Sequence, residues 1–170
     1  MAVEIERKFL LRDARWRAEV VRSRRMAQGY LVGAAAHAMG AARASVRVRV
    51  ADADAWLNIK AARTAIEREE YEYPIPRADA ERMLAQLCGA VIEKIRHQVP
   101  AGDFVFEVDE FLGANAGLVV AEIELPAVDA AFPRPAWLGR EVSADSRYFN
   151  VLLAEYPYSA WSLAQRQENG

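Results

Sequence analysis

Several features that define common classes of protein are scarce in this chain. One cysteine, Cys88, among 170 residues excludes an intramolecular disulfide and a multi-cysteine metal site. No apolar run approaches the length of a membrane span, and the opening MAVEIERKF lacks the basic-then-apolar layout of a secretion signal. A formal net charge of −2 provides no global basic field for nucleic acid or an acidic membrane. We therefore expect a cytoplasmic protein with a single domain over residues 1–170, without nucleic-acid or membrane partners.

Lysine is scarce as well, because Lys8, Lys60 and Lys94 are the only lysines among 22 basic side chains. All three lie in strand-like segments beside other charged residues. Lysine carries a compact point charge on a flexible stem, whereas arginine brings a larger planar fork. This placement supports a role in which a compact positive charge is needed and the larger guanidinium of arginine does not suffice.

The most informative pattern is the alternation of charged and apolar residues. It occurs in Glu4-Ile5-Glu6-Arg7-Lys8, Arg47-Val48-Arg49 and Glu122-Ile123-Glu124, and similar alternation recurs in the other strand-like segments. Side chains of a strand point alternately to its two faces, so each segment projects its charges to one side. The set expected on the charged side contains Glu4, Glu6, Lys8, Arg47, Arg49, Lys60, Arg68, Glu70, Glu72, Lys94, Arg96, Glu107, Asp109, Glu122 and Glu124.

Eight strands are expected from this pattern, at residues 3–11, 28–32, 45–50, 55–61, 67–75, 91–99, 104–112 and 118–125. A change to helical spacing predicts a helix capped by Asp79, and Asp145 is expected to cap another. Residues 33–44, rich in alanine and glycine, are expected to form a flexible loop. The basic run from Arg22 to Arg25 is expected to be a solvated turn.

A dry interior cannot hold so many charges, because desolvating each ion costs on the order of several kcal/mol. One possibility is an open two-layer fold whose charged face is simply solvated. The other is an antiparallel sheet closed into a barrel, which leaves an interior wide enough for one small ligand. The density of Glu and Arg favours closure. The predicted fold class is thus α+β, an eight-stranded antiparallel closed β-barrel, or tunnel, with helices packed outside.

Both signs of charge in one cavity suit a metal–polyphosphate complex, since carboxylates bind hard cations and Arg or Lys binds phosphate oxygens. At this point the sequence resembles a known family. The opening Glu4-Ile5-Glu6-Arg7-Lys8 is similar to the ExExK signature of the CYTH family, also called triphosphate tunnel metalloenzymes. Later segments resemble its further motifs in the same order: Gln28-Gly29-Tyr30, Arg47-Val48-Arg49, Ile59-Lys60, Glu70-Tyr71-Glu72-Tyr73, Glu93-Lys94-Ile95-Arg96, Glu107-Val108-Asp109, Ala121-Glu122-Ile123-Glu124-Leu125, Gly139-Arg140-Glu141-Val142 and Asp145-Ser146-Arg147-Tyr148-Phe149-Asn150.

The resemblance covers roughly residues 3–157 and implies hydrolysis of a triphosphate with Mg²⁺ or Mn²⁺. For the small bacterial members it implies cleavage of inorganic tripolyphosphate to pyrophosphate and phosphate. The implied metal ligands are Glu4, Glu6, Asp109, Glu122 and Glu124. The implied substrate-binding residues are Lys8, Arg47, Arg49, Lys60, Lys94, Arg96 and, from the rim, Arg140. Roles in catalysis are implied for Glu6, Lys8, Tyr30 and Glu72, with Tyr30 as a proton acceptor. A departure is Asn58, where the family frequently has threonine.

Alternatives within the family are thiamine triphosphatase and class IV adenylate cyclase. A cyclase has to seat an adenine base, and the inward positions offer no obvious aromatic clamp, although Trp56 and Tyr30 could serve. Outside these activities, a non-catalytic module that binds polyphosphate or nucleotides remains, as does a structural barrel with internal ion pairs. A homodimer is possible, but no segment of the sequence indicates an interface.

Overall fold

The computed structural model describes residues 2–62 and 66–167. Its strands are β1 (Ala2–Leu11), β2 (Arg22–Val32), β3 (Ser45–Ala51), β4 (Asp54–Ala62), β5 (Glu67–Pro74), β6 (Ile92–Ala101), β7 (Phe104–Phe111), β8 (Val119–Glu124) and β9 (Leu138–Glu141). The α-helices are α1 (Ala34–Ala38), α2 (Arg77–Gln86), α3 (Asn150–Glu155) and α4 (Leu163–Gln167). Short 3₁₀ helices occupy Arg15–Glu19, Gly113–Asn115, Ser146–Tyr148 and Tyr158–Ala160. Among the described residues, no helix is both long and apolar enough to span a bilayer.

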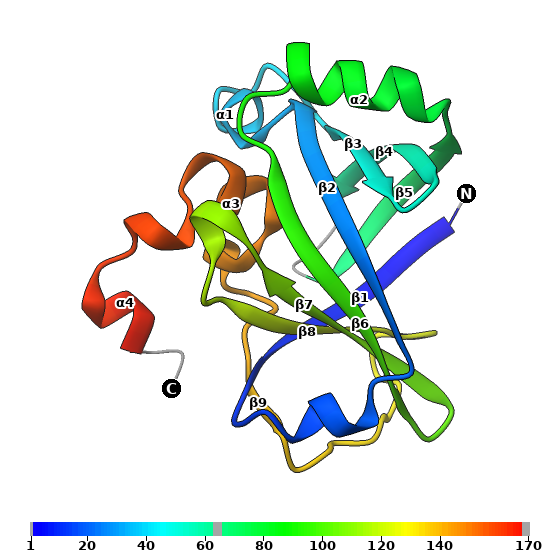
Figure 1. The fold of residues 1–170 in the computed structure, drawn as a ribbon, viewed down its shortest axis with the longest axis vertical. Coiled ribbons are helices and arrows are strands. Elements are labelled where there is room, and N and C mark those ends of the chain that lie inside the picture. Colours follow the sequence, from blue (N-terminus) through cyan, green and yellow to red (C-terminus); the bar gives the residue numbers. More distant parts are fainter. Residues whose placement is uncertain (1, 63–65, 168–170) are drawn as a thin grey trace.

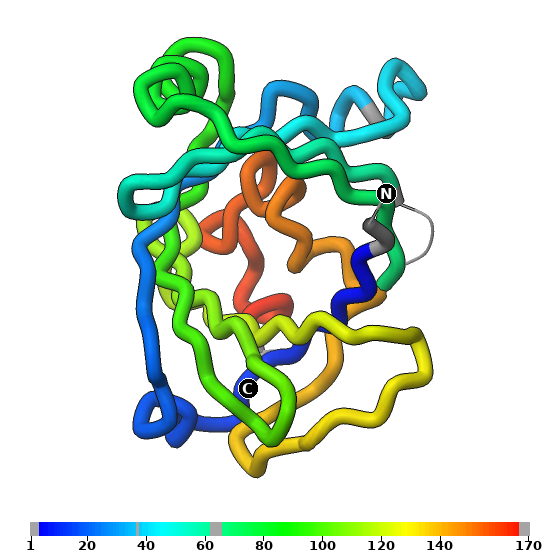
Figure 2. Tube along the Cα trace, turned by 90° about the vertical axis from the view of Figure 1, so that its right-hand side faces the viewer, coloured from blue at the N-terminus to red at the C-terminus, as the bar shows by residue number. Residues whose placement is uncertain are grey.

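Eight of the strands form a closed antiparallel ring in the order β5-β4-β3-β2-β6-β7-β8-β1, and β1 returns to β5 (Figure 2). Strand β1 closes the ring by dividing its length between two neighbours. Its first residues, from Ala2 to Ile5, pair with β5, and the next ones, from Glu6 to Phe9, pair with β8. Beyond a register shift near Phe9, β1 also pairs with the short β9. The predicted eight-stranded barrel is confirmed, with β9 as an additional strand beside it.

The apolar core lies outside the ring, because the alternating strands turn their apolar side chains outward. Helix α2 covers β3 and its neighbours through a cluster that includes Val48, Val50 and Ala80 (Figure 1). A second cluster contains Phe9, Phe106 and Trp137, and a third joins the barrel to the C-terminal segment. Burying apolar surface contributes about 25 cal/mol per Å², so these outer layers supply stability that a charged lumen cannot.

One glycine is required by the packing of α2 against the barrel. A Cβ atom added at Gly29 would lie 2.8 Å from Cβ and 2.9 Å from Sγ of Cys88, just beyond the helix. Real Cβ atoms do not approach other carbons so closely, so the chain after α2 can rest on β2 only at a glycine. The half-buried Cys88 is a packing residue here, and burial raises the pKa of its thiol.

Some expectations about local structure were wrong. The run from Arg22 to Arg25 is not a turn but the start of β2, because it pairs with β6 over residues 95–98. The predicted loop 33–44 contains the helix α1. Asp79 does not cap α2: the helix begins at Arg77 after Pro76, and Asp79 lies in its first turn. Asp145 caps only a 3₁₀ turn, where its side chain accepts a hydrogen bond from the Arg147 backbone N–H.

Candidate active site inside the barrel

The ring encloses a cavity of about 960 Å³ whose walls are the charged faces of the strands. The C-terminal segment that includes Phe149 and Asn150 also lines it, and this segment is seen through the ring in Figure 2. The lining residues include most of the set predicted to face inward: Glu4, Glu6, Lys8, Arg47, Arg49, Lys60, Arg68, Glu70, Glu72, Arg96, Glu107, Glu122 and Glu124. The charges therefore converge in a common lumen, as the closed-barrel interpretation expects.

Lys8 lies at the centre of one set of ion pairs. Its Nζ atom contacts carboxylate oxygens of Glu6 on the same strand and of Glu122 on β8. Only 3% of the residue is exposed. Burial lowers the pKa of Lys8, but the attraction of Glu122 and Glu6 outweighs it and raises the pKa to about 12. Lys8 is thus a fixed positive charge in the lumen. Lys8 belongs to a connected set of ion pairs that we call the Lys8 network. It contains Glu6, Lys8, Lys94, Arg96, Glu107, Asp109 and Glu122.

Arg96 on β6 extends this network across β7 and β8. Its guanidinium donates to Asp109 at 2.7 and 2.6 Å and to Glu122 at 2.6 Å, and it also contacts Glu107. Burial opposes the charge of Arg96, yet Asp109 and the other carboxylates raise its pKa well above the usual value. Three carboxylates therefore orient one guanidinium, which leaves its remaining surface facing the cavity.

Two of the predicted site residues lie behind the cavity wall and do not line it. Lys94 is 1% exposed and contacts Asp109, which is fully buried and also binds Arg96. Burial, together with Arg96, lowers the pKa of Lys94 to about 8 in spite of Asp109. In this structure Lys94 and Asp109 form a layer that supports Arg96 from behind.

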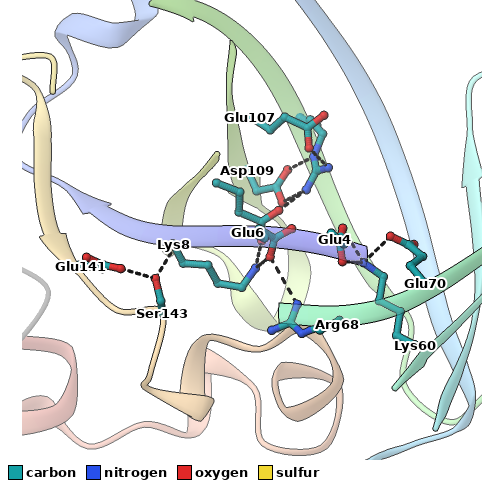
Figure 3. A network of polar contacts seen from close by, with 12 residues as sticks. Glu4, Glu6, Lys8, Lys60, Arg68, Glu70, Glu107, Asp109, Glu141 and Ser143 are labelled. Atoms are coloured by element: carbon teal, nitrogen blue, oxygen red, sulfur yellow. Dashed lines mark hydrogen bonds and ion pairs between the residues drawn. The ribbon is translucent and has the colours of Figure 1, made fainter. Parts of the chain in front are cut away.

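The opposite wall, made by β3, β4 and β5, carries a second set of contacts. Lys60 donates to Glu4 at 2.7 Å and lies 3.2 Å from Glu70 (Figure 3). Arg49 donates to Glu72 at 2.7 Å. We call this set the Lys60 network, and it contains Glu4, Arg47, Arg49, Asn58, Lys60, Glu70 and Glu72. Burial raises the pKa of Glu4 to about 7, although Lys60 pulls in the other direction.

Arg68 is a further cation of the cavity lining, and the sequence pattern placed it in the inward set without giving it a role. It lies on β5, its Nη1 atom is 3.5 Å from Glu6, and its guanidinium is 5.1 Å from the centre of the Phe149 ring. The alternation with Glu70 and Glu72 is the signal that identifies it as a cavity residue. No comparable signal marks Phe149, which reaches the cavity from the segment just before α3.

The remaining predicted residues occupy different environments. Tyr30 lines the cavity, and burial raises the pKa of its phenol although the nearby Arg47 lowers it. The raised pKa favours a protonated hydroxyl, which suits a hydrogen-bond donor better than a proton acceptor. Arg140 is exposed on β9 and does not belong to the cavity lining. Trp56 is also absent from the lining, and the guanidinium of Arg49 lies 5.2 Å from its ring centre.

The carboxylates fit a hard cation that shares its coordination with a substrate. Glu6 and Glu124 face each other across β1 and β8, and Glu124 makes no ion pair with the part of the chain that the structure describes. Within that part, no group of three acidic, histidine or cysteine side chains forms a complete cage. Mg²⁺ usually keeps several waters and is held by one or two carboxylates plus substrate phosphates, so a complete cage is not needed.

Comparison with known proteins agrees with this architecture. The model of the CYTH domain matches residues 2–153. An inorganic triphosphatase of Acetivibrio thermocellus is 51% identical over 115 residues, which cover 67% of this chain and 74% of that protein. An inorganic triphosphatase of Nitrosomonas europaea is 33% identical over 158 residues, covering 89% of this chain and 96% of that protein. A crystal structure of an inorganic triphosphatase is similar with a TM-score of 0.61 and 31% identity, covering 91% of this chain and 95% of that one. Because the matched residues include the whole ring and its charged lumen, the chain belongs to the CYTH domain family.

Proposed function

We propose that this chain is a metal-dependent triphosphatase that hydrolyses inorganic tripolyphosphate to pyrophosphate and phosphate inside the barrel. The observation that carries the proposal is the convergence of cationic and acidic side chains from β1, β3, β4, β5, β6, β7 and β8 in one cavity. The names of the two curated relatives, both inorganic triphosphatases, support the choice of substrate.

The cations are suited to hold the substrate. Phosphoryl transfer asks a protein mainly for positioning and for neutralisation of charge on the phosphate oxygens. Lys8 and Arg96 are held rigidly on one wall, and Arg47, Arg49 and Lys60 face them from the other. Tripolyphosphate between these walls would exchange its hydration shell for preorganised donors, and such donors are most effective in a cavity with little water. Arg68 is placed to bind a further oxygen, because its contact with Glu6 is long.

The acidic residues have two roles in this proposal. Glu6 and Glu124 would hold the cation, Mg²⁺ or Mn²⁺, together with Glu4 or Glu122 at its edge. When bound, the cation supplies neutralisation of charge on the phosphate oxygens and polarisation of the bond that is cleaved. Glu72, at the other wall, is the carboxylate we assign to orienting the attacking water. Tyr30 acts as a hydrogen-bond donor to a phosphate oxygen, since burial raises its pKa.

A panel of phosphate-release assays tests the proposal. Tripolyphosphate, thiamine triphosphate, ATP and pyrophosphate are each supplied with Mg²⁺, with Mn²⁺ and with excess EDTA. We expect tripolyphosphate to have the highest kcat/KM, with activity lost in EDTA. Preference for thiamine triphosphate or release of pyrophosphate from ATP would instead assign the chain to another activity of its family. Binding without turnover of any of the four would make it a polyphosphate-binding module.

The cytoplasmic location and a homodimer remain predictions, and size-exclusion chromatography with light scattering tests whether the protein is a dimer.

A further inference from the structure

A neutral side chain occupies the middle of the otherwise charged Lys60 network. Asn58 lies on β4, opposite Arg47 of β3 and Glu72 of β5, and none of its surface is exposed. Its Nδ2 atom donates to Glu70 at 2.9 Å and to Glu72 at 2.5 Å. A single amide group therefore binds two carboxylates that project from the same face of one strand.

The amide of Asn58 reduces the repulsion between the two carboxylates that it binds. Glu70 and Glu72 are two residues apart on β5, so their like charges point in the same direction and repel each other. An amide nitrogen carries two hydrogens and no net charge, and here each hydrogen is directed to a different carboxylate. A hydroxyl at this position has one hydrogen, and it could satisfy only one of the two. A cationic side chain would satisfy both but would add charge to the wall.

The two carboxylates in turn orient the cations of this wall. Glu72 accepts from Arg49 through Oε2, which is also the oxygen that Asn58 binds. Glu70 accepts from Asn58 through Oε1, which also lies 3.8 Å from Nη2 of Arg47, and its Oε2 lies 3.2 Å from Nζ of Lys60. The hydrogen bonds from Asn58 therefore restrain both carboxylates. Without Asn58, the carboxylates could rotate apart and take the Arg49 and Lys60 head groups with them.

We propose that Asn58 is a positioning residue for the triphosphate: it acts through Glu70 and Glu72 to hold Arg47, Arg49 and Lys60 in a geometry that binds the anion. This inference rests on the proposed function for the identity of the anion. It assigns to Asn58 no contact with substrate. Within residues 2–62 and 66–167, the buried Oδ1 atom of Asn58 and the buried Nε atoms of Arg47 and Arg49 have no hydrogen-bond partner, so the groups of this wall do not satisfy one another completely.

Calorimetric titration of tripolyphosphate in EDTA tests the inference apart from turnover. We expect Asn58→Ala to weaken binding about tenfold, the effect of losing a hydrogen bond to a charged group. Asn58→Thr, which keeps one donor, should fall between wild type and Asn58→Ala. Asn58→Asp, which removes both donors and adds a third carboxylate at nearly constant shape, should bind most weakly. Gln86→Ala is the matched control, since Gln86 is an exposed amide at the end of α2.

Kinetics give a second readout that a general loss of stability would not produce. KM should rise by the factor seen in binding, and kcat should fall as well, because Asn58 also holds Glu72, which we assign to orienting the attacking water. A general loss of stability would lower the amount of active enzyme without raising KM. Circular dichroism checks that each variant folds; if Asn58→Ala does not fold, Asn58→Thr and Asn58→Asp decide the question. Tripolyphosphate affinity in the folded variants within about twofold of wild type would overturn the inference, and so would equal losses in Asn58→Thr and Asn58→Ala. Wild-type binding without phosphate release would overturn the proposed function and leave the role of Asn58 intact.

Discussion

Replacing Lys8 by methionine is the sharpest test of how the charges in the lumen support one another. Methionine has nearly the same length as lysine but no charge, so the change leaves Glu6 and Glu122 without their shared cation. Both carboxylates are well shielded from water, with side-chain exposures of 14% and 6%. We expect a folded but less stable protein that no longer hydrolyses tripolyphosphate.

The size of the loss follows from burial and charge. The rise of the Lys8 pKa from 10.5 to about 12 corresponds to about 2 kcal/mol in favour of the charged form in the folded protein. Removing the cation also leaves the buried Glu122 with Arg96 and the buried Glu6 with the more distant Arg68, and breaking a buried pair costs about 3–5 kcal/mol. With a urea dependence of about 2 kcal/mol per molar, the unfolding midpoint at neutral pH should fall by about 2 M.

The loss should depend on pH in a definite direction. Burial favours the protonated form of Glu122, but Lys8 and Arg96 hold its pKa well below the usual 4.5. The stability that comes from this lowered pKa is complete above pH about 4.5 and is lost as the pH falls further. The curves of wild type and Lys8→Met should therefore converge at acidic pH. Lys60→Met is the control and should cost less, because Lys60 and its partners are more exposed. A Lys8→Met midpoint no lower than that of Lys60→Met would show that Lys8 does not stabilise the barrel through Glu6 and Glu122.

Three further predictions concern single residues. Glu124→Gln should weaken Mg²⁺ binding at least tenfold. Stability should change little, because Glu124 makes no ion pair with the described residues. Calorimetric titration with Mg²⁺ measures the affinity, and an unchanged affinity would remove Glu124 from the metal site. Glu4 has a pKa raised to about 7, so its ionisation lowers wild-type stability as the pH rises from 5 to 8. Glu4→Gln should gain stability over wild type across that interval, by at most about 3 kcal/mol. If the urea midpoints of Glu4→Gln and wild type differ by the same amount at pH 5 and at pH 8, the raised pKa of Glu4 is contradicted. Arg140→Ala should keep wild-type KM for tripolyphosphate, because Arg140 is exposed outside the cavity lining; a rise in KM of about fivefold or more would place it at the rim after all.

The sequence predicts the barrel well because alternation along a strand determines which face a residue occupies. Glu122 and Glu124 share a face with period two, and closure of the ring makes that face the lumen. The alternation does not determine how deep in the barrel a side chain lies, because that depth depends on the tilt and stagger of all the strands together. For this reason Lys94 and Asp109 were expected beside Arg96 at the cavity surface, and the structure places them behind it.

Contacts between distant segments were also beyond the sequence pattern. Arg140 follows a glycine in a motif-like segment, yet β9 pairs with the end of β1 and leaves Arg140 outside the lining. Phe149 carries no charge and shows no alternation, and it reaches the cavity because the C-terminal segment packs across the barrel. The bridging role of Asn58 depends on the register of β4 against β5, which places it directly opposite Glu72.

The central claim is that opposite charges gathered inside the ring form the binding site for a triphosphate. A crystal structure of the protein with Mg²⁺ and a non-hydrolysable imido analogue of tripolyphosphate measures this directly. We expect the anion within hydrogen-bond distance of Lys8 and Arg96 on one wall and of Arg47, Arg49 and Lys60 on the other. An anion bound on the outer surface, with the ion pairs of the lumen unchanged, would contradict it.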